Sequence, residues 1–283
     1  MTTAWIEIES PRARALLRQA LESVPQRLDW AALAVAALEH PEVDQDFCEQ
    51  TLDGYAERVR ARIDGSTDLF EQIQALRHVL GVEEGFRGHR LDDIEGLENS
   101  FLDQVLRRKV GLPITLSVVY LEVARRVGVA IFGVSFPGHF LLACEIGGSK
   151  LAIDPFAGGE ILTESGCQSL LRKVAPQIRF HPRMLVPASV KVISSRMLNN
   201  LKRLYLDSDE REKALRVMDL LLLLTPDHPG DLRTRAGLLS SLGAYRAALK
   251  DVERCLSISP HAPDSRQLRW TASALRERVD TLN

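Results

Sequence analysis

The last third of the chain repeats itself, and this repeat constrains the fold more than any other feature. Residues 199–230 align with residues 233–264 at an offset of 34. The aligned pairs are Leu204 with Leu238, Ala214 with Ala248, Leu215 with Leu249, Leu222 with Leu256, Pro226 with Pro260, and Pro229 with Pro263. A unit this short cannot bury its apolar face alone, so neighbouring units must stack. Because the prolines would end each second helix, the pattern predicts stacked helical pairs.

A helix-turn-helix period of 34 residues is typical of tetratricopeptide repeats. The second copy resembles them most, with Gly243, Tyr245 and Ala248 at the turn, aromatic and small-residue positions. We therefore predict an all-α tail over residues 191–283, closed by a capping helix from Gln267 to Leu282. The alternative is an ordinary helical bundle with coincidental self-similarity. Such repeats bind proteins, but about three are needed to stand alone, so binding a partner and packing on the first domain both stay open.

Residues 1–190 are predicted to form a first domain of α+β type. Apolar residues recur at three- and four-residue spacing from Pro11 to Leu80, which predicts about four helices with breaks at Pro25, His40–Pro41, Asp64–Gly65 and Gly81. Two more helices are expected over 97–108 and 113–127. Residues 129–136, 139–146 and 150–156 are rich in β-branched and aromatic residues, so we expect them to form a small antiparallel sheet.

Composition excludes several classes of function. The chain has 36 basic and 38 acidic residues, and a net charge of −2 gives no general attraction to nucleic acid or to an anionic membrane. No stretch approaches the ~18 apolar residues of a membrane span, and the start lacks the apolar core of a signal peptide, so we expect a cytoplasmic protein. The four cysteines form no CxxC pair, so we expect reduced thiols, no metal and no cofactor.

Several central segments resemble the transglutaminase-like superfamily, and in particular its SirB-type branch, in which tetratricopeptide repeats follow the domain. The matching segments are NSFLDQVLRRKVGLPITLSVVYLEVARRVGV, GVSFPGHFLLA, LAIDPF and FAGGEIL. With the tail, the resemblance covers nearly the whole chain. It implies a papain-like core, with a helical layer packed on the small antiparallel sheet.

Active members of that superfamily use a Cys-His-Asp triad. A thiol at a helix N-terminus has a lowered pKa, an imidazole takes its proton, and a carboxylate orients the imidazole. By resemblance, the histidine corresponds to His139 and the aspartate to Asp154. Counting back from Arg125 and Gly128, which match the end of the helix, places Pro113 where the thiol would stand. Proline cannot act as a nucleophile, so the resemblance implies that His139 and Asp154 are the retained remnant of a triad.

Other side chains are weak candidates for a substitute nucleophile. At ~100° per residue, Thr115 faces away from Pro113, and Ser117 lies on nearly the same face but ~6 Å along the helix axis. Cys144 falls on the opposite strand face from His139 and is expected in the core. A separate basic group is either an anion site or solvated surface, and consists of Arg87, Arg90, Arg107, Arg108 and Lys109.

Two functions follow as hypotheses. The first is a non-catalytic transglutaminase-like protein that acts as a protein-interaction or regulatory module through its repeat tail. The second is a hydrolase or acyltransferase in which His139 and Asp154 work with a non-standard nucleophile or an activated water. An accessible His139–Asp154 pair with a nucleophile beside it would favour the second.

Overall fold

The computed structural model describes residues 10–89 and 96–281, which form two compact units. The larger unit runs from Ala15 to Met197. The smaller unit combines the described residues up to Arg14 with those from Leu198 onwards. The divisions fall inside two helices, Pro11–Glu22 and Val190–Asp207, whereas we expected one boundary near residue 190, where the second of these helices begins. No helix in the described ranges is long and apolar enough to cross a membrane.

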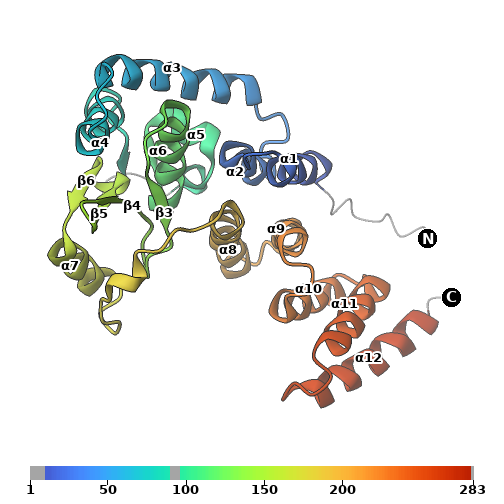
Figure 1. Ribbon diagram of the computed structural model, residues 1–283. Coiled ribbons are helices and arrows are strands. Elements are labelled where there is room, and N and C mark those ends of the chain that lie inside the picture. Colours follow the sequence, from blue (N-terminus) through green and yellow to red (C-terminus); the bar gives the residue numbers. More distant parts are fainter. Residues whose placement is uncertain (1–9, 90–95, 282–283) are drawn as a thin grey trace. The chain divides into compact units, whose positions relative to one another are not determined.

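The first helices of the chain form the predicted helical layer (Figure 1). They are α1 (Pro11–Glu22), α2 (Leu28–Ala36), α3 (Gln45–Ile63) and α4 (Leu69–Arg77). Asp44 accepts a hydrogen bond from the backbone N–H of Phe47 at 2.9 Å and so caps α3, and Asp68 caps α4 in the same way. These side chains satisfy backbone donors at the two N-termini, which explains why both helices begin there.

The expected break at Gly81 is wrong. Helix α4 passes directly into a π-helix over His78–Glu83. A Cβ atom on Gly81 would stand 2.2 Å from the carbonyl oxygen of Gly158. Glycine is therefore present because two backbone segments meet at this point. Residues Arg87–Gly88 then form the short strand β1.

Helix α6 (Pro113–Val127) has the predicted bounds and lies at the centre of the larger unit. Pro113 occupies its first turn, and Gly128 ends it with φ +77°. The helix contacts α2, α3, α4 and α5 (Leu102–Arg108), and also strands β3 and β4 (Figure 1). Strand β2 (Val110–Gly111) precedes it and pairs in parallel with β1. Leu116, Val119, Tyr120 and Val123 are fully buried, so α6 is the hydrophobic centre of this unit.

The predicted antiparallel sheet is present and contains one more strand than expected. Its order is β3 (Phe132–Val134), β4 (Leu141–Ile146), β5 (Ser149–Asp154) and β6 (Glu160–Leu162). Strands β4 and β5 pair with Ala143 opposite Ala152. Strand β6, which the sequence analysis missed, is short and bonds to β5. Helix α7 (Glu164–Val174) follows and packs against the sheet.

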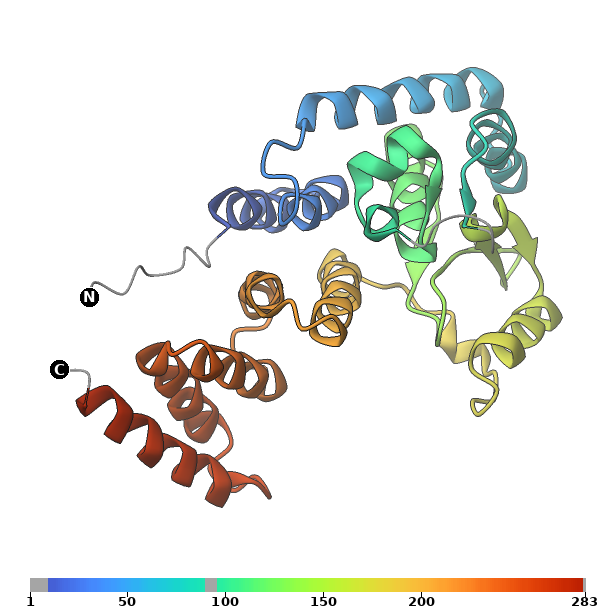
Figure 2. The same ribbon diagram turned by 180° about the vertical axis from the view of Figure 1, so that it is seen from behind.

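The smaller unit consists of the predicted stacked helices. They are the part of α8 (Val190–Asp207) from Leu198 onwards, α9 (Arg211–Leu224), α10 (Pro229–Ser241), α11 (Tyr245–Ile258) and α12 (Ser265–Asp280). Helices α9 to α12 stack in chain order (Figure 2). Ala248, the predicted small residue, is completely buried where α10 and α11 approach. The expected capping helix corresponds to α12, although Leu282 lies outside the described residues.

Candidate functional site

The sheet brings His139 and Asp154 together. His139 lies just before β4 and Asp154 ends β5, and an antiparallel pair places the start of one strand beside the end of the other. The Nε2 atom of His139 lies 2.9 Å from Oδ1 of Asp154. The two residues are only 7% and 5% exposed. The resemblance therefore selected two residues that form a buried hydrogen-bonded pair.

Asp154 is held by a second hydrogen bond. The backbone N–H of Phe156 donates to Oδ1 of Asp154 at 3.0 Å, so the carboxylate also caps the 3₁₀ turn Pro155–Ala157. An ionised carboxylate only accepts hydrogen bonds, so Nε2 of His139 would donate to it, and a neutral imidazole would then have its lone pair at Nδ1. No described residue hydrogen-bonds to Nδ1. The geometry is suited to a general base that accepts a proton at Nδ1.

Arg196 of α8 holds the loop that carries His139. Its guanidinium donates to Oγ of Ser135 and to the carbonyl oxygen of Phe136, both at 2.8 Å, and to the carbonyl oxygen of His139 at 2.5 Å. Burial lowers the pKa of Arg196. The sequence analysis missed this residue because the contact joins positions 57 residues apart, and no local pattern reports such a contact.

Loss of the Arg196 contacts is expected to destabilise the larger unit. Arg196→Met keeps an unbranched apolar stem and removes hydrogen bonds from a charged donor, so we expect the free energy of unfolding to fall by about 1.5–3 kcal/mol. Urea denaturation measures the change. Arg183→Met is the control, because Arg183 is exposed in the same unit. Equal losses in the two variants would show that Arg196 does not hold the loop.

Aromatic and glycine residues surround the His139–Asp154 pair. The ring of Phe156 packs edge-on against both His139 and His89, at centroid distances of 5.7 and 5.4 Å. A Cβ atom on Gly88 would lie 2.4 Å from that ring. Gly88 therefore makes room for Phe156. The sequence analysis did not identify His89 or Phe156, because their contact depends on strand β1 lying against the distant turn Pro155–Ala157.

Tyr120 of α6 is another side chain that the sequence analysis did not assign to the site. It is fully buried, and its hydroxyl hydrogen-bonds to no residue in the described part of the chain. Burial raises its pKa, the positive charge of Arg77 opposes this rise, and the negative charge of Asp154 adds to it. A Cβ atom on Gly159 would stand 3.1 Å from the Tyr120 hydroxyl. Tyr120 thus packs beneath the turn that follows Asp154.

The candidate nucleophiles on α6 are not activated by any described neighbour. Pro113 begins the helix. The Ser117 hydroxyl donates to the carbonyl oxygen of Pro113 at 2.7 Å, which is an ordinary backbone contact within a helix. The Thr115 hydroxyl is buried and has no hydrogen-bond partner among the described residues. Neither hydroxyl therefore has a hydrogen-bonded base in the described structure.

The four cysteines are buried, free thiols. Burial raises the pKa of each one above its ordinary value of 9.0, to about 12 for Cys48 and about 11 for Cys167. Cys144 points its sulfur at the carbonyl oxygen of Leu151, at 3.9 Å. A reactive thiol needs a lowered pKa and access to solvent, and none of these four has either property.

The thiol environments predict slow alkylation and slow disulfide exchange. At pH 8 a thiol with a pKa of about 11 is ~0.1% ionised, against ~10% at an ordinary pKa of about 9. We expect Ellman's reagent to react with the folded chain at least ~100-fold more slowly than with the chain in guanidinium. A cysteine that reacts equally fast in both states would contradict the assignment.

The basic residues near Lys109 contact different neighbours, and the Arg87 guanidinium donates to the carbonyl oxygen of Gly88 at 3.0 Å. Arg107 stacks over the ring of Phe47, with its Cζ 3.9 Å from the centroid. Lys109 forms an ion pair with Glu84 at 2.9 Å. Arg108 hydrogen-bonds to the side chain of Asn99. Arg90 lies outside the described residues. The positive charges that the structure places are thus engaged separately, each by its own neighbour.

Among the described residues, no group of three or more His, Cys, Asp or Glu side chains could hold a metal ion.

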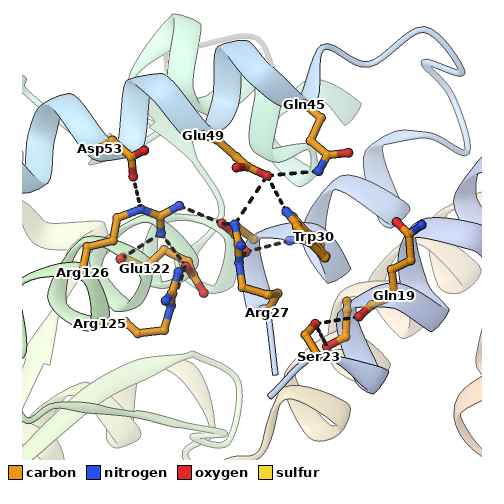
Figure 3. Close-up of polar contacts among 12 residues, drawn as sticks. Gln19, Ser23, Arg27, Trp30, Gln45, Glu49, Asp53, Glu122, Arg125 and Arg126 are labelled. Carbon is orange, nitrogen blue, oxygen red and sulfur yellow. Dashed lines mark hydrogen bonds and ion pairs between the residues drawn. The ribbon is translucent and has the colours of Figure 1, made fainter. Parts of the chain in front are cut away.

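Arg126 is the centre of an ion network that joins three helices and is buried except at Asp53 (Figure 3). It bonds Asp29 of α2 at 2.8 Å, Asp53 of α3 at 2.6 Å, and Glu122 one turn earlier on α6 at 2.5 Å. Arg27 adds a bidentate contact to Asp29 at 2.9 and 2.8 Å. Asp29 and Glu122 are 0% and 1% exposed, so the network fixes α6 from the side of the helical layer.

This network predicts a dependence of stability on pH. Burial would raise the pKa of Asp29, but hydrogen bonds and charge from Arg27 and Arg126 outweigh burial and lower it below 3.8. A carboxyl with a lowered pKa contributes stability above its unfolded value and loses it as pH falls through the folded value. Below about pH 4 we therefore expect stability to fall more steeply in the native sequence than in Asp29→Asn, as measured by urea denaturation. Equal slopes would contradict this.

Comparison with known proteins agrees with the fold. Residues 46–199 match the family model of the transglutaminase-like superfamily, and residues 201–272 match a tetratricopeptide repeat model. A UPF0162 protein of Xylella fastidiosa is 33% identical over 88% of this chain and 90% of its own length. A UPF0162 protein of Pseudomonas aeruginosa is 31% identical over 84% and 87%.

A eukaryotic relative matches a smaller part of the chain. F-box only protein 21 of Homo sapiens is 32% identical over 61% of this chain but only 28% of its own length. No solved structure matches. The family models cover both parts of the chain, and the bacterial relatives match at nearly full length. The chain therefore belongs to the SirB-type UPF0162 proteins of the transglutaminase-like superfamily, which carry tetratricopeptide repeats after the domain.

Proposed function

We propose that this chain is a non-catalytic member of its family, and that it binds another protein in the cytoplasm through residues 191–283. Stacked tetratricopeptide helices support the binding role, because repeats of this type present extended surfaces to partners. The function of the family's domain would then be regulatory or structural.

Pro113 carries the non-catalytic part of the proposal. Counting back from Arg125 and Gly128 aligns Pro113 with the position of the thiol in active relatives. In this chain the residue there is the proline that begins α6. The described cysteines are buried and their pKa values are raised, so none of them replaces the thiol. His139 and Asp154 would then persist as a pair without a nucleophile.

Partner capture separates binding from catalysis. Interacting proteins are purified with three tagged proteins: the full-length chain, His139→Ala, and a chain that ends at Asp207. Mass spectrometry quantifies the proteins that each one captures. The cut follows Asp207 because α8 carries Arg196, which holds the His139 loop. We expect the full chain and His139→Ala to capture the same proteins, and the truncated chain to lose them. Loss in His139→Ala with an unchanged melting temperature would contradict the proposal.

A hydrolase or acyltransferase is the second candidate, and the His139–Asp154 bond favours it. An oriented imidazole with Nδ1 as acceptor can activate water or an unrecognised nucleophile. Full-length chain is assayed with p-nitrophenyl esters and with a fluorescent amine as acyl acceptor. We expect the native chain to turn over neither substrate faster than His139→Ala does. Turnover that depends on His139 would establish the enzymatic alternative.

Placing a thiol at residue 113 tests whether Pro113 corresponds to the nucleophile position of active relatives. If Pro113 occupies the nucleophile position, Pro113→Cys places a sulfur at the N-terminus of α6, where its pKa falls. We expect iodoacetamide to label Pro113→Cys faster at pH 6 than it labels any native cysteine, and His139→Ala in the same chain to slow this labelling. Labelling that is insensitive to His139 would show that the register is wrong.

A further inference from the structure

The smaller unit contains a groove with a volume of about 550 Å³. It lies among α9, α10 and α11, and we call it the α9–α11 groove. Leu222 and Leu223 of α9, Pro226 after it, and Leu232 of α10 provide its apolar surface. Its volume is within the ~300–1,000 Å³ of ligand pockets. It is large enough for a few side chains of a bound peptide.

The acidic residues of the α9–α11 groove are already paired. Arg235 bonds Asp251 with two contacts of 2.7 Å and Asp219 with one of 2.5 Å. Glu253 pairs with Arg276 at 2.6 Å. Each carboxylate in the lining therefore has an arginine, and the groove offers little negative charge to an occupant.

The basic residues of the groove are less fully paired. Lys250 of α11 is exposed, and no described residue forms an ion pair with it. Arg14 reaches Asp219 only at 3.9 Å, and Arg235 already holds that carboxylate. Arg254 pairs with Asp227, but both side chains are 54% exposed, and an exposed pair of this kind exchanges partners at little cost. The charge available to a ligand is therefore positive.

We propose that the α9–α11 groove binds an acidic segment of a partner protein in which carboxylates alternate with aliphatic side chains. The inference rests on the proposed protein-binding function and specifies the partner's chemistry. Aliphatic side chains would cover Leu223 and Pro226, and carboxylates would meet Lys250, Arg254 and Arg14. Charge complementarity of this kind sets specificity and accelerates association, and added salt weakens it.

Defined peptides test the charge and the apolar parts separately. Fluorescein-labelled peptides of about twelve residues are built from Glu-Leu-Ser, Gln-Leu-Ser, Lys-Leu-Ser or Glu-Ser-Ser repeats. Fluorescence anisotropy follows their binding to the full-length chain. We expect Glu-Leu-Ser to bind at least ~10-fold more tightly than each of the other three, and to weaken between low and high salt. Equal binding of Gln-Leu-Ser or of Glu-Ser-Ser would overturn the proposal.

A charge reversal locates the binding site. Lys250→Glu is expected to weaken Glu-Leu-Ser binding by ~10-fold or more. Arg266→Glu is the matched control, because Arg266 is exposed on α12 and makes the same change of charge away from the groove lining. Thermal melting checks that both variants fold. Equal weakening by the two variants would show that net charge, rather than this groove, attracts the peptide.

Leu223, an apolar residue of the groove lining, supplies a second variant. Leu223 is partly buried, so Leu223→Gln removes apolar contact without emptying the core. We expect it to reduce Glu-Leu-Ser binding and to leave the weak binding of Glu-Ser-Ser unchanged. If no peptide binds the full chain, the groove proposal fails, and partner capture still decides the protein-binding function independently.

Discussion

Arg126→Ala is expected to lower the free energy of unfolding by about 3 kcal/mol, because it removes one of the two guanidinium partners from each of the buried carboxylates Asp29 and Glu122. Asp29 and Glu122 are essentially inaccessible to water, and the Arg126 side chain is only 10% exposed. Water cannot replace the lost hydrogen bonds without opening the junction of α2, α3 and α6. Guanidinium denaturation of the full chain measures the loss.

Arg125→Ala is the matched control for this prediction. Arg125 bonds the same Glu122 at 2.8 and 3.0 Å, but its own side chain is 36% exposed. Its removal also leaves Arg126 on the same carboxylate, so we expect a loss below about 1 kcal/mol. A comparable loss in the two variants would mean that burial of Arg126 does not determine the energy. Arg126→Met then separates charge from packing, because it keeps most of the stem.

Gly81→Ala is expected to destabilise the larger unit by about 3 kcal/mol, at the upper end of the usual cost of overpacking. The added Cβ would stand 2.2 Å from the carbonyl oxygen and 2.9 Å from the carbonyl carbon of Gly158. Both obstacles are backbone atoms, so no side-chain rotation relieves the overlap. The π-helix must move away from the turn after Asp154, or that turn must shift.

Gly54→Ala provides the comparison. Gly54 lies within α3, and a Cβ there would meet no atom within 4 Å. Because alanine favours helices by about 1 kcal/mol over glycine, we expect no loss or a small gain. Urea denaturation of the two variants in parallel shows how much of the loss in unfolding free energy comes from the steric overlap at Gly81. If Gly81→Ala is as stable as Gly54→Ala, the backbone approach at Gly158 does not constrain this position.

Much of the architecture could be predicted because it depends on local or periodic patterns. The 34-residue offset predicted stacked helical pairs over the tail. Pro113 and Gly128 fixed both ends of α6 through backbone preferences that act within one turn. The strand pattern predicted neighbouring β4 and β5, and this pairing is what brings His139 to Asp154.

The contacts that escaped prediction join distant parts of the chain. Arg196 holds His139 from 57 residues away, and Arg126 bonds Asp29 from 97 residues away. Neither spacing matches a helix or strand period, so no local pattern could report them. The π-helix was missed because glycine within a helical pattern usually marks an end, whereas Gly81 allows a close backbone contact.

Asp154 combines two tasks in one oxygen atom. Oδ1 accepts from His139 and also from the backbone N–H of Phe156, which begins the 3₁₀ turn that leads to Gly158 and β6. The aspartate therefore supports the turn as well as contacting His139. The Asp-Pro-Phe segment is thus accounted for by the fold of this corner, and its presence alone does not identify an enzyme.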